Sequence, residues 1–102
     1  MSSALLTADL FAPHTGTRFT IARAQAGLAG VPLELKSVEP WGPEPRSAGD
    51  RRPFTLTFRG PADPLVPQAT YQLAHDALGT HDVFLVPIAA DQRGSTYEAV
   101  FT

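Results

Sequence analysis

Six short runs of alternating apolar and polar residues, separated by segments rich in Gly and Pro, constrain the fold of this chain more than any other feature. The clearest runs are residues 54–59 (FTLTFR) and 70–75 (TYQLAH). Successive side chains of a strand point to opposite faces, so each run presents one apolar face and one polar face. Repeated along the chain with short connections, the pattern predicts a small all-β domain.

The strands are expected at residues 17–23, 32–39, 54–59, 69–75, 81 to 86 or 88, and 96–101. Pro87 has no backbone donor and therefore marks the end of the fifth strand, a bulge or an edge. The side chains expected to point inward are Phe19, Ile21, Leu33, Leu35, Phe54, Leu56, Phe58, Tyr71, Leu73, Phe84, Val86, Tyr97, Ala99 and Phe101, with Thr55, Thr57 and Gln72 outward. Residues 7–12 predict one helical turn, capped by Thr7 or Asp9 and stopped by Pro13.

These elements predict one domain over residues 1–102. No long helical pattern separates the strands, which favours antiparallel neighbours over parallel βαβ units. We expect a six-stranded antiparallel meander, closed or partly open as a barrel, with the short helix over one mouth. A two-sheet β-sandwich is the alternative. Connections of a meander alternate between two ends, which brings His14, His75 and His81 to the same end as Trp41.

Composition excludes several classes of function. The chain has no cysteine, which excludes disulfides, thiolate catalysis and cysteine-ligated zinc. Its net charge of -2 lacks the basic excess of a nucleic-acid-binding protein. No segment predicts membrane insertion or a signal peptide. We expect synthesis in the cytoplasm, with export only as part of an assembly.

Motifs for catalysis are absent from the sequence: there is no GxSxG, no P-loop and no GxGxxG. We therefore expect no enzymatic activity and no cofactor. A metal-dependent enzyme using His75 and His81, with His14 as a further candidate ligand, is an alternative. The absence of a third strong ligand favours turn and strand-end roles for these histidines, without a metal.

Residues 40–52 form the one long connection, and it carries Trp41, the only tryptophan. Connections of this length in compact domains are usually functional or disordered. Trp41 is either a binding aromatic or a plug folded back on the core, and the gain from burying its large apolar surface favours the plug. Arg46, Arg51 and Arg52 either lie in solvent or bind a partner.

The strand at 96–101 carries only Glu98 as a charged residue, and neither Lys nor Pro protects it against pairing. In an open barrel this strand, and next the strand at 17–23, would pair with another chain; if the two pair with each other, the barrel closes and has no edge. We therefore expect a non-catalytic interaction or assembly module that binds a protein partner or a second copy. A small-ligand or carbohydrate-binding barrel using the Trp41 end is an alternative. The interaction residues are expected to be Trp41, Arg46, Arg51, Arg52, Tyr97, Glu98 and Val100.

Most of the chain resembles a bacterial single-domain family of unknown function. The resemblance is carried by residues 9–13, 16–19, 53–61, 67–75, 78–79, 84–87 and 97–101, and it excludes only the 40–52 segment. It implies a bacterial origin and a genomic neighbourhood that can include phage-tail-collar-like fibre proteins, and it assigns no catalytic residue. Among the matched residues, Arg59 ends an apolar strand, and we expect it to pair with a carboxylate such as Glu98.

Overall fold

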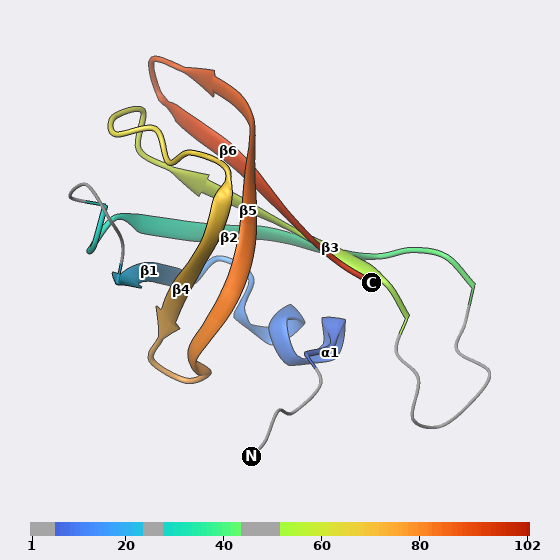
Figure 1. Ribbon diagram of the computed structural model, residues 1–102. Coiled ribbons are helices and arrows are strands. Elements are labelled where there is room, and N and C mark those ends of the chain that lie inside the picture. Colours follow the sequence, from blue (N-terminus) through green and yellow to red (C-terminus); the bar gives the residue numbers. More distant parts are fainter. Residues whose placement is uncertain (1–5, 24–27, 44–51) are drawn as a thin grey trace.

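The strands and the helix form where the sequence pattern places them. The computed structural model describes residues 6–23, 28–43 and 52–102. Within them lie α1 (Ala8–Phe11), a 3-10 turn (Ala12–His14), β1 (Arg18–Arg23), β2 (Pro32–Pro40), β3 (Phe54–Gly60), β4 (Ala69–His75), β5 (Gly79–Asp91) and β6 (Gly94–Phe101). The strands form a closed antiparallel barrel, which confirms the expected fold class (Figure 1).

The order of the strands around the barrel is β1-β2-β3-β6-β5-β4, with β4 pairing back to β1. The predicted meander is therefore wrong in its connectivity, because β3 pairs with β6 rather than with β4. β3 and β4 lie opposite each other in this order, so residues 61–68 cross one end of the barrel. Val66 in this crossing is fully buried, and its N–H donates to the Tyr97 hydroxyl at 2.9 Å.

Neither predicted edge strand is an edge. β6 pairs with β3 along residues 95–101 and with β5 along residues 94–98. β1 lies between β2 and β4. Closure does not come from pairing of the first and last strands, as the sequence suggested, but from the β1–β4 and β3–β6 pairs. β6 is therefore paired on both sides along residues 95–98, while residues 99–101 pair with β3 alone.

Burial along the strands follows the predicted alternation everywhere except in β5. Phe54, Leu56 and Phe58 are fully buried in β3, as expected. In β5, Phe84 is 47% exposed and Val86 is half-buried, whereas Val83 and Leu85 are buried, so the prediction for this strand is wrong. Residues 83–86 are all apolar, and the sequence cannot choose between the two faces. The register with β4 determines which face of β5 points into the core, because Val83 lies opposite the inward-pointing Tyr71. Pro87 lies at a register shift in the β5–β6 pairing, which is one of the three predicted positions.

The short helix covers the aromatic end of the core. Thr7 caps α1, and its side chain accepts a hydrogen bond from the Leu10 N–H, as predicted. Phe11 is only 1% exposed. Its ring centroid lies 6.3 Å from that of Phe19 and 6.0 Å from those of Phe54 and Phe101. α1 contacts β2, and Figure 1 shows α1 at the end of the barrel away from the β5–β6 turn. In the described part of the chain, no helix has the length and apolar character needed to cross a membrane.

Candidate functional site

An exposed aromatic side chain and an exposed aliphatic side chain lie on the outer face of the β2–β3–β6 sheet. Trp41, directly after β2, is 43% exposed, and its Nε1–H donates to the Thr55 hydroxyl at 3.1 Å. Thr55 is the register partner of Val100 in β6, which is 53% exposed. Glu39 is the partner of Thr55 on the β2 side. Trp41 is therefore not a plug in the core, and the favoured interpretation is wrong.

We name this surface the Trp41 patch, and it consists of Glu39, Trp41, Thr55, Glu98 and Val100. Glu98 belongs to it because its partner Thr57 lies two residues beyond Thr55 on the same face of β3. The fold places each member by strand alternation: Phe54, Leu56 and Ala99 point into the core, so their neighbours point out. Glu39 and Thr55 were missed at the sequence level because only the strand order brings them beside Trp41.

The remaining predicted interaction residues divide into three groups. Tyr97 is fully buried, and its hydroxyl accepts from the Val66 N–H, so this side chain is not available to a partner. Arg52 is half-buried, and its Nε–H donates to the Gly42 carbonyl at 2.9 Å, which ties the end of the 40–52 segment back to its beginning. Arg46 and Arg51 lie outside the described residues.

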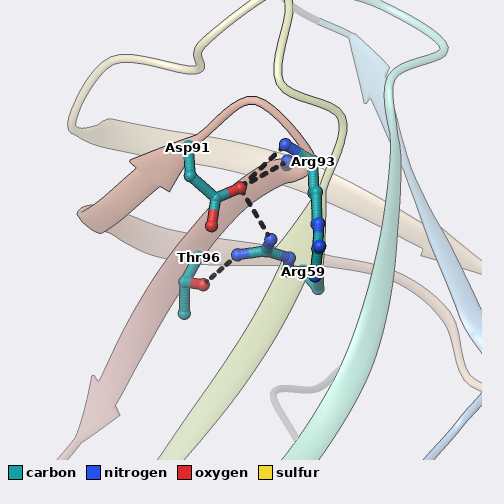
Figure 2. Close-up of polar contacts among 5 residues, drawn as sticks. Arg59, Asp91, Arg93 and Thr96 are labelled. Carbon is teal, nitrogen blue, oxygen red and sulfur yellow. Dashed lines mark hydrogen bonds and ion pairs between the residues drawn. The ribbon is translucent and has the colours of Figure 1, made fainter.

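Arg59 pairs with Asp91 rather than with the expected Glu98. Its guanidinium donates to Asp91 Oδ1 at 3.2 Å and to the Thr96 hydroxyl at 2.8 Å, as Figure 2 shows. Asp91 Oδ1 also accepts the N–H groups of Arg93 and Gly94. The Arg93 hydrogen bond is the largest cause that lowers the pKa of the Asp91 carboxyl. The cluster fastens the β5–β6 turn to the end of β3 and has a structural role.

A groove of about 460 Å³ lies over β1, β2 and β3, and the Trp41 patch is not part of it. Its charged members Arg18, Glu34 and Arg59 are register partners on the outer face. Arg59 is held by Asp91, and Glu34 lies 3.6 Å from Lys36 Nζ. The groove therefore offers no support for a ligand site that uses the Trp41 end.

His14 and His75 meet at one end of the barrel, and both ring nitrogens of His75 take part in hydrogen bonds. The His14 and His75 ring centroids are 4.8 Å apart, which confirms the predicted clustering for this pair. His75 Nδ1 accepts the N–H groups of Ala77 and Leu78, and Nε2 lies 2.9 Å from the Thr17 hydroxyl. His81 Nε2 lies 2.7 Å from the Leu78 carbonyl and donates to it. His75 thus has no free ring nitrogen for a metal. Among the residues described, no group of three or more His, Cys, Asp or Glu side chains could hold one.

Comparison with known families agrees with the sequence resemblance. A family model described as Domain of unknown function (DUF6916) matches residues 6–101. The chain belongs to this family. No curated protein and no solved structure matches it. The function of the DUF6916 family is unknown, so the functional argument depends on the surface of this barrel.

Proposed function

We propose that this domain is a non-catalytic interaction module that binds a protein partner through the Trp41 patch. The observation that carries the proposal is the exposure of Trp41 and Val100 on either side of Thr55. Tryptophan is among the residues that contribute most to protein interfaces, since it combines a large apolar surface with an N–H donor. Paired strands beneath the patch hold these side chains in place, so binding requires little ordering.

The acidic members of the patch favour a different protein over a second copy as the partner. Glu39 lies on the β2 side of the patch, and Glu98 lies on β6. In a two-fold symmetric dimer the same patch faces itself, which would bring two sets of these carboxylates together. Like charges across an interface are unfavourable, whereas a basic rim would be attracted. The proposed partner therefore presents an apolar centre with Lys or Arg around it.

The biological setting that we propose is an assembly in a bacterium. It rests on the sequence resemblance, which implies a genomic neighbourhood that can include phage-tail-collar-like fibre proteins. A small closed barrel that presents an exposed contact surface is suited to be an accessory or component of a phage-tail-like or surface fibre. The absence of catalytic motifs from the sequence is consistent with this role.

The test starts with affinity purification from cells that produce the protein, followed by binding measurements with the purified partner. Trp41→Ala is expected to weaken binding by about thirtyfold or more, which corresponds to loss of a hot-spot residue. Glu39→Lys is also expected to weaken binding, because it places a positive charge opposite the basic rim of the partner. Leu65→Ser is the matched control, because Leu65 is 49% exposed but lies in the 61–68 crossing at the opposite end of the barrel. Equal affinities of the wild type and Trp41→Ala would refute the proposal. A dimer of the wild type that Trp41→Ala dissociates would show that a second copy is the partner.

A further inference from the structure

The groove over β1, β2 and β3 has an arginine on each side. Arg18 begins β1 and Arg59 lies near the end of β3, and both are register partners of Glu34 in β2. Neighbouring strands lie about 4.8 Å apart, so the backbones of the two arginines are about 10 Å apart across the groove. Both side chains point outward, because the adjacent Phe19 and Phe58 are buried. Two guanidinium groups can therefore approach one ligand from opposite sides.

The carboxylate between the two arginines pairs with neither of them. Glu34 is the only acidic residue that lines the groove, and its Oε2 lies 3.6 Å from Lys36 Nζ. Within residues 6–23, 28–43 and 52–102, no ion pair joins Glu34 to Arg18 or Arg59. The Arg18 side chain is exposed and has no hydrogen bond or ion pair within this part of the chain. Arg18 is therefore available to an anion from solution.

The Arg59 guanidinium is held in place with donors to spare. It donates to Asp91 Oδ1 at 3.2 Å and to the Thr96 hydroxyl at 2.8 Å, which uses two of its five N–H groups. Figure 2 shows the Arg93 side chain pointing toward Arg59 from the β5–β6 turn. Among the described residues, the Arg93 guanidinium has no ion pair. One fixed and one unpartnered guanidinium thus lie at the β3 side of the groove.

Positive charge is concentrated at this groove although the chain as a whole is acidic. Asp91 offsets part of the charge, but its Oδ1 already accepts three N–H groups. Four cationic and two acidic side chains lie in or beside the groove, against a net charge of -2 for the whole chain: Arg18, Lys36, Arg59 and Arg93, with Glu34 and Asp91. An anion with two negative charges matches this excess.

We propose that this groove binds a small phosphate monoester that carries hydroxyl groups, with the phosphate between Arg18 and Arg59. A phosphate has oxygens on several sides and can accept from guanidinium groups on both, whereas one bidentate arginine satisfies a carboxylate. The groove volume of about 460 Å³ lies in the range of small-molecule sites, roughly 300–1,000 Å³, and leaves room for more than the phosphate. Glu34 can accept hydrogen bonds from the hydroxyl groups. This site is separate from the Trp41 patch and goes beyond the proposed function.

NMR titration of the ¹⁵N-labelled protein at constant ionic strength tests the proposal, with glucose 6-phosphate, inorganic phosphate, O-phosphoserine and glucose as probes. Glucose 6-phosphate is expected to give saturable shifts at the Arg18 and Gly60 amides and to bind more tightly than inorganic phosphate or O-phosphoserine. Glucose is expected to give none. Binding of glucose 6-phosphate should weaken between about pH 7.5 and about pH 5, because a phosphate monoester loses its second charge near about pH 6.

Three variants separate a site from a general effect of charge. Arg18→Gln is expected to weaken the binding of glucose 6-phosphate by about tenfold or more, as for loss of a charge-assisted hydrogen bond. Its fold should be retained, since this side chain has no partner in the described structure. Arg52→Gln is the matched control, because it removes the same charge at the other end of β3 and should leave the affinity unchanged. Glu34→Gln keeps an acceptor but removes the negative charge, so it should tighten the binding of inorganic phosphate.

Four results would overturn the site. The first is the absence of saturable shifts at the groove amides with glucose 6-phosphate. The second is an equal loss of affinity in Arg18→Gln and Arg52→Gln, which would assign the effect to net charge. The third is glucose 6-phosphate that binds no more tightly than inorganic phosphate, which would mean an adventitious ion only. The fourth is tighter binding of O-phosphoserine, which would assign the groove to a phosphorylated side chain. None of these results affects binding through the Trp41 patch.

Discussion

Removing one oxygen atom from Tyr97 tests how the 61–68 crossing is held inside the barrel. Tyr97 and Val66 are both fully buried, and the Val66 N–H donates to the Tyr97 hydroxyl at 2.9 Å. Tyr97→Phe keeps the ring and nearly all of its volume but leaves a buried N–H without an acceptor. Such a group costs about 1–3 kcal/mol, which is a large part of the ~5–15 kcal/mol that stabilises a domain. We therefore expect the free energy of unfolding to fall by that amount.

Urea unfolding followed by circular dichroism measures this loss as a lower midpoint with an unchanged slope. Hydrogen exchange should show faster exchange at the Val66 amide than in the wild type. Tyr71→Phe is the matched control: the Tyr71 hydroxyl donates to the Pro67 carbonyl at 2.7 Å, and Pro67 is exposed, so water can replace the donor. Its cost should be smaller, about 0.5–1.5 kcal/mol or less. A Tyr97→Phe variant that is no less stable than Tyr71→Phe would refute the argument.

Three further predictions concern the core and the β5–β6 turn. Phe58→Ala should lower the free energy of unfolding by about 3–5 kcal/mol, because Phe58 is fully buried. Phe84→Ala should lower it by under about 1 kcal/mol, because Phe84 is half-exposed. Urea unfolding measures both losses, and a larger loss for Phe84→Ala than for Phe58→Ala would show that the face assigned to Phe84 in β5 is wrong. Gly94→Ala would place a Cβ 2.6 Å from the Gly60 carbonyl oxygen, so we expect a lower melting temperature, and an unchanged one would show that the turn can shift freely. The pKa of Asp91 is lowered, so its ionised form stabilises the fold at pH values above the usual pKa of 3.8, and this contribution is lost as the pH falls through the lowered pKa. Asp91→Asn should therefore weaken the acid dependence of the melting temperature below about pH 4. An unchanged acid dependence would contradict this role.

Element positions could be predicted from the sequence because strand alternation is a local property. The β4 bounds Ala69–His75 are as predicted, and the other strands differ at their ends by a few residues. The ends at which connections meet could also be predicted, because every neighbouring pair in the barrel is antiparallel. That is why His14 and His75 were correctly placed together.

Strand order could not be predicted, because the 61–68 connection is short enough for a hairpin and nothing in its residues excludes one. Burial of Val66 and its hydrogen bond to Tyr97 are long-range features that appear only when the crossing is in place. The same limit applies to the candidate site. The sequence left two roles open for Trp41, a binding aromatic or a plug in the core. Its position over Thr55 depends on the register of β2, β3 and β6, which the sequence does not show.

The fluorescence of Trp41 during addition of the purified partner tests the proposed contact surface most directly. Trp41 is the only tryptophan in the chain and is 43% exposed in the free domain, so its emission reports on this patch alone when the partner lacks tryptophan or carries it in a non-fluorescent form. Binding through the Trp41 patch predicts a blue shift of the emission and a loss of quenching by acrylamide, saturating with the same affinity as an independent binding measurement. A partner that binds with Trp41 emission and quenching both unchanged would contradict the proposed interaction surface.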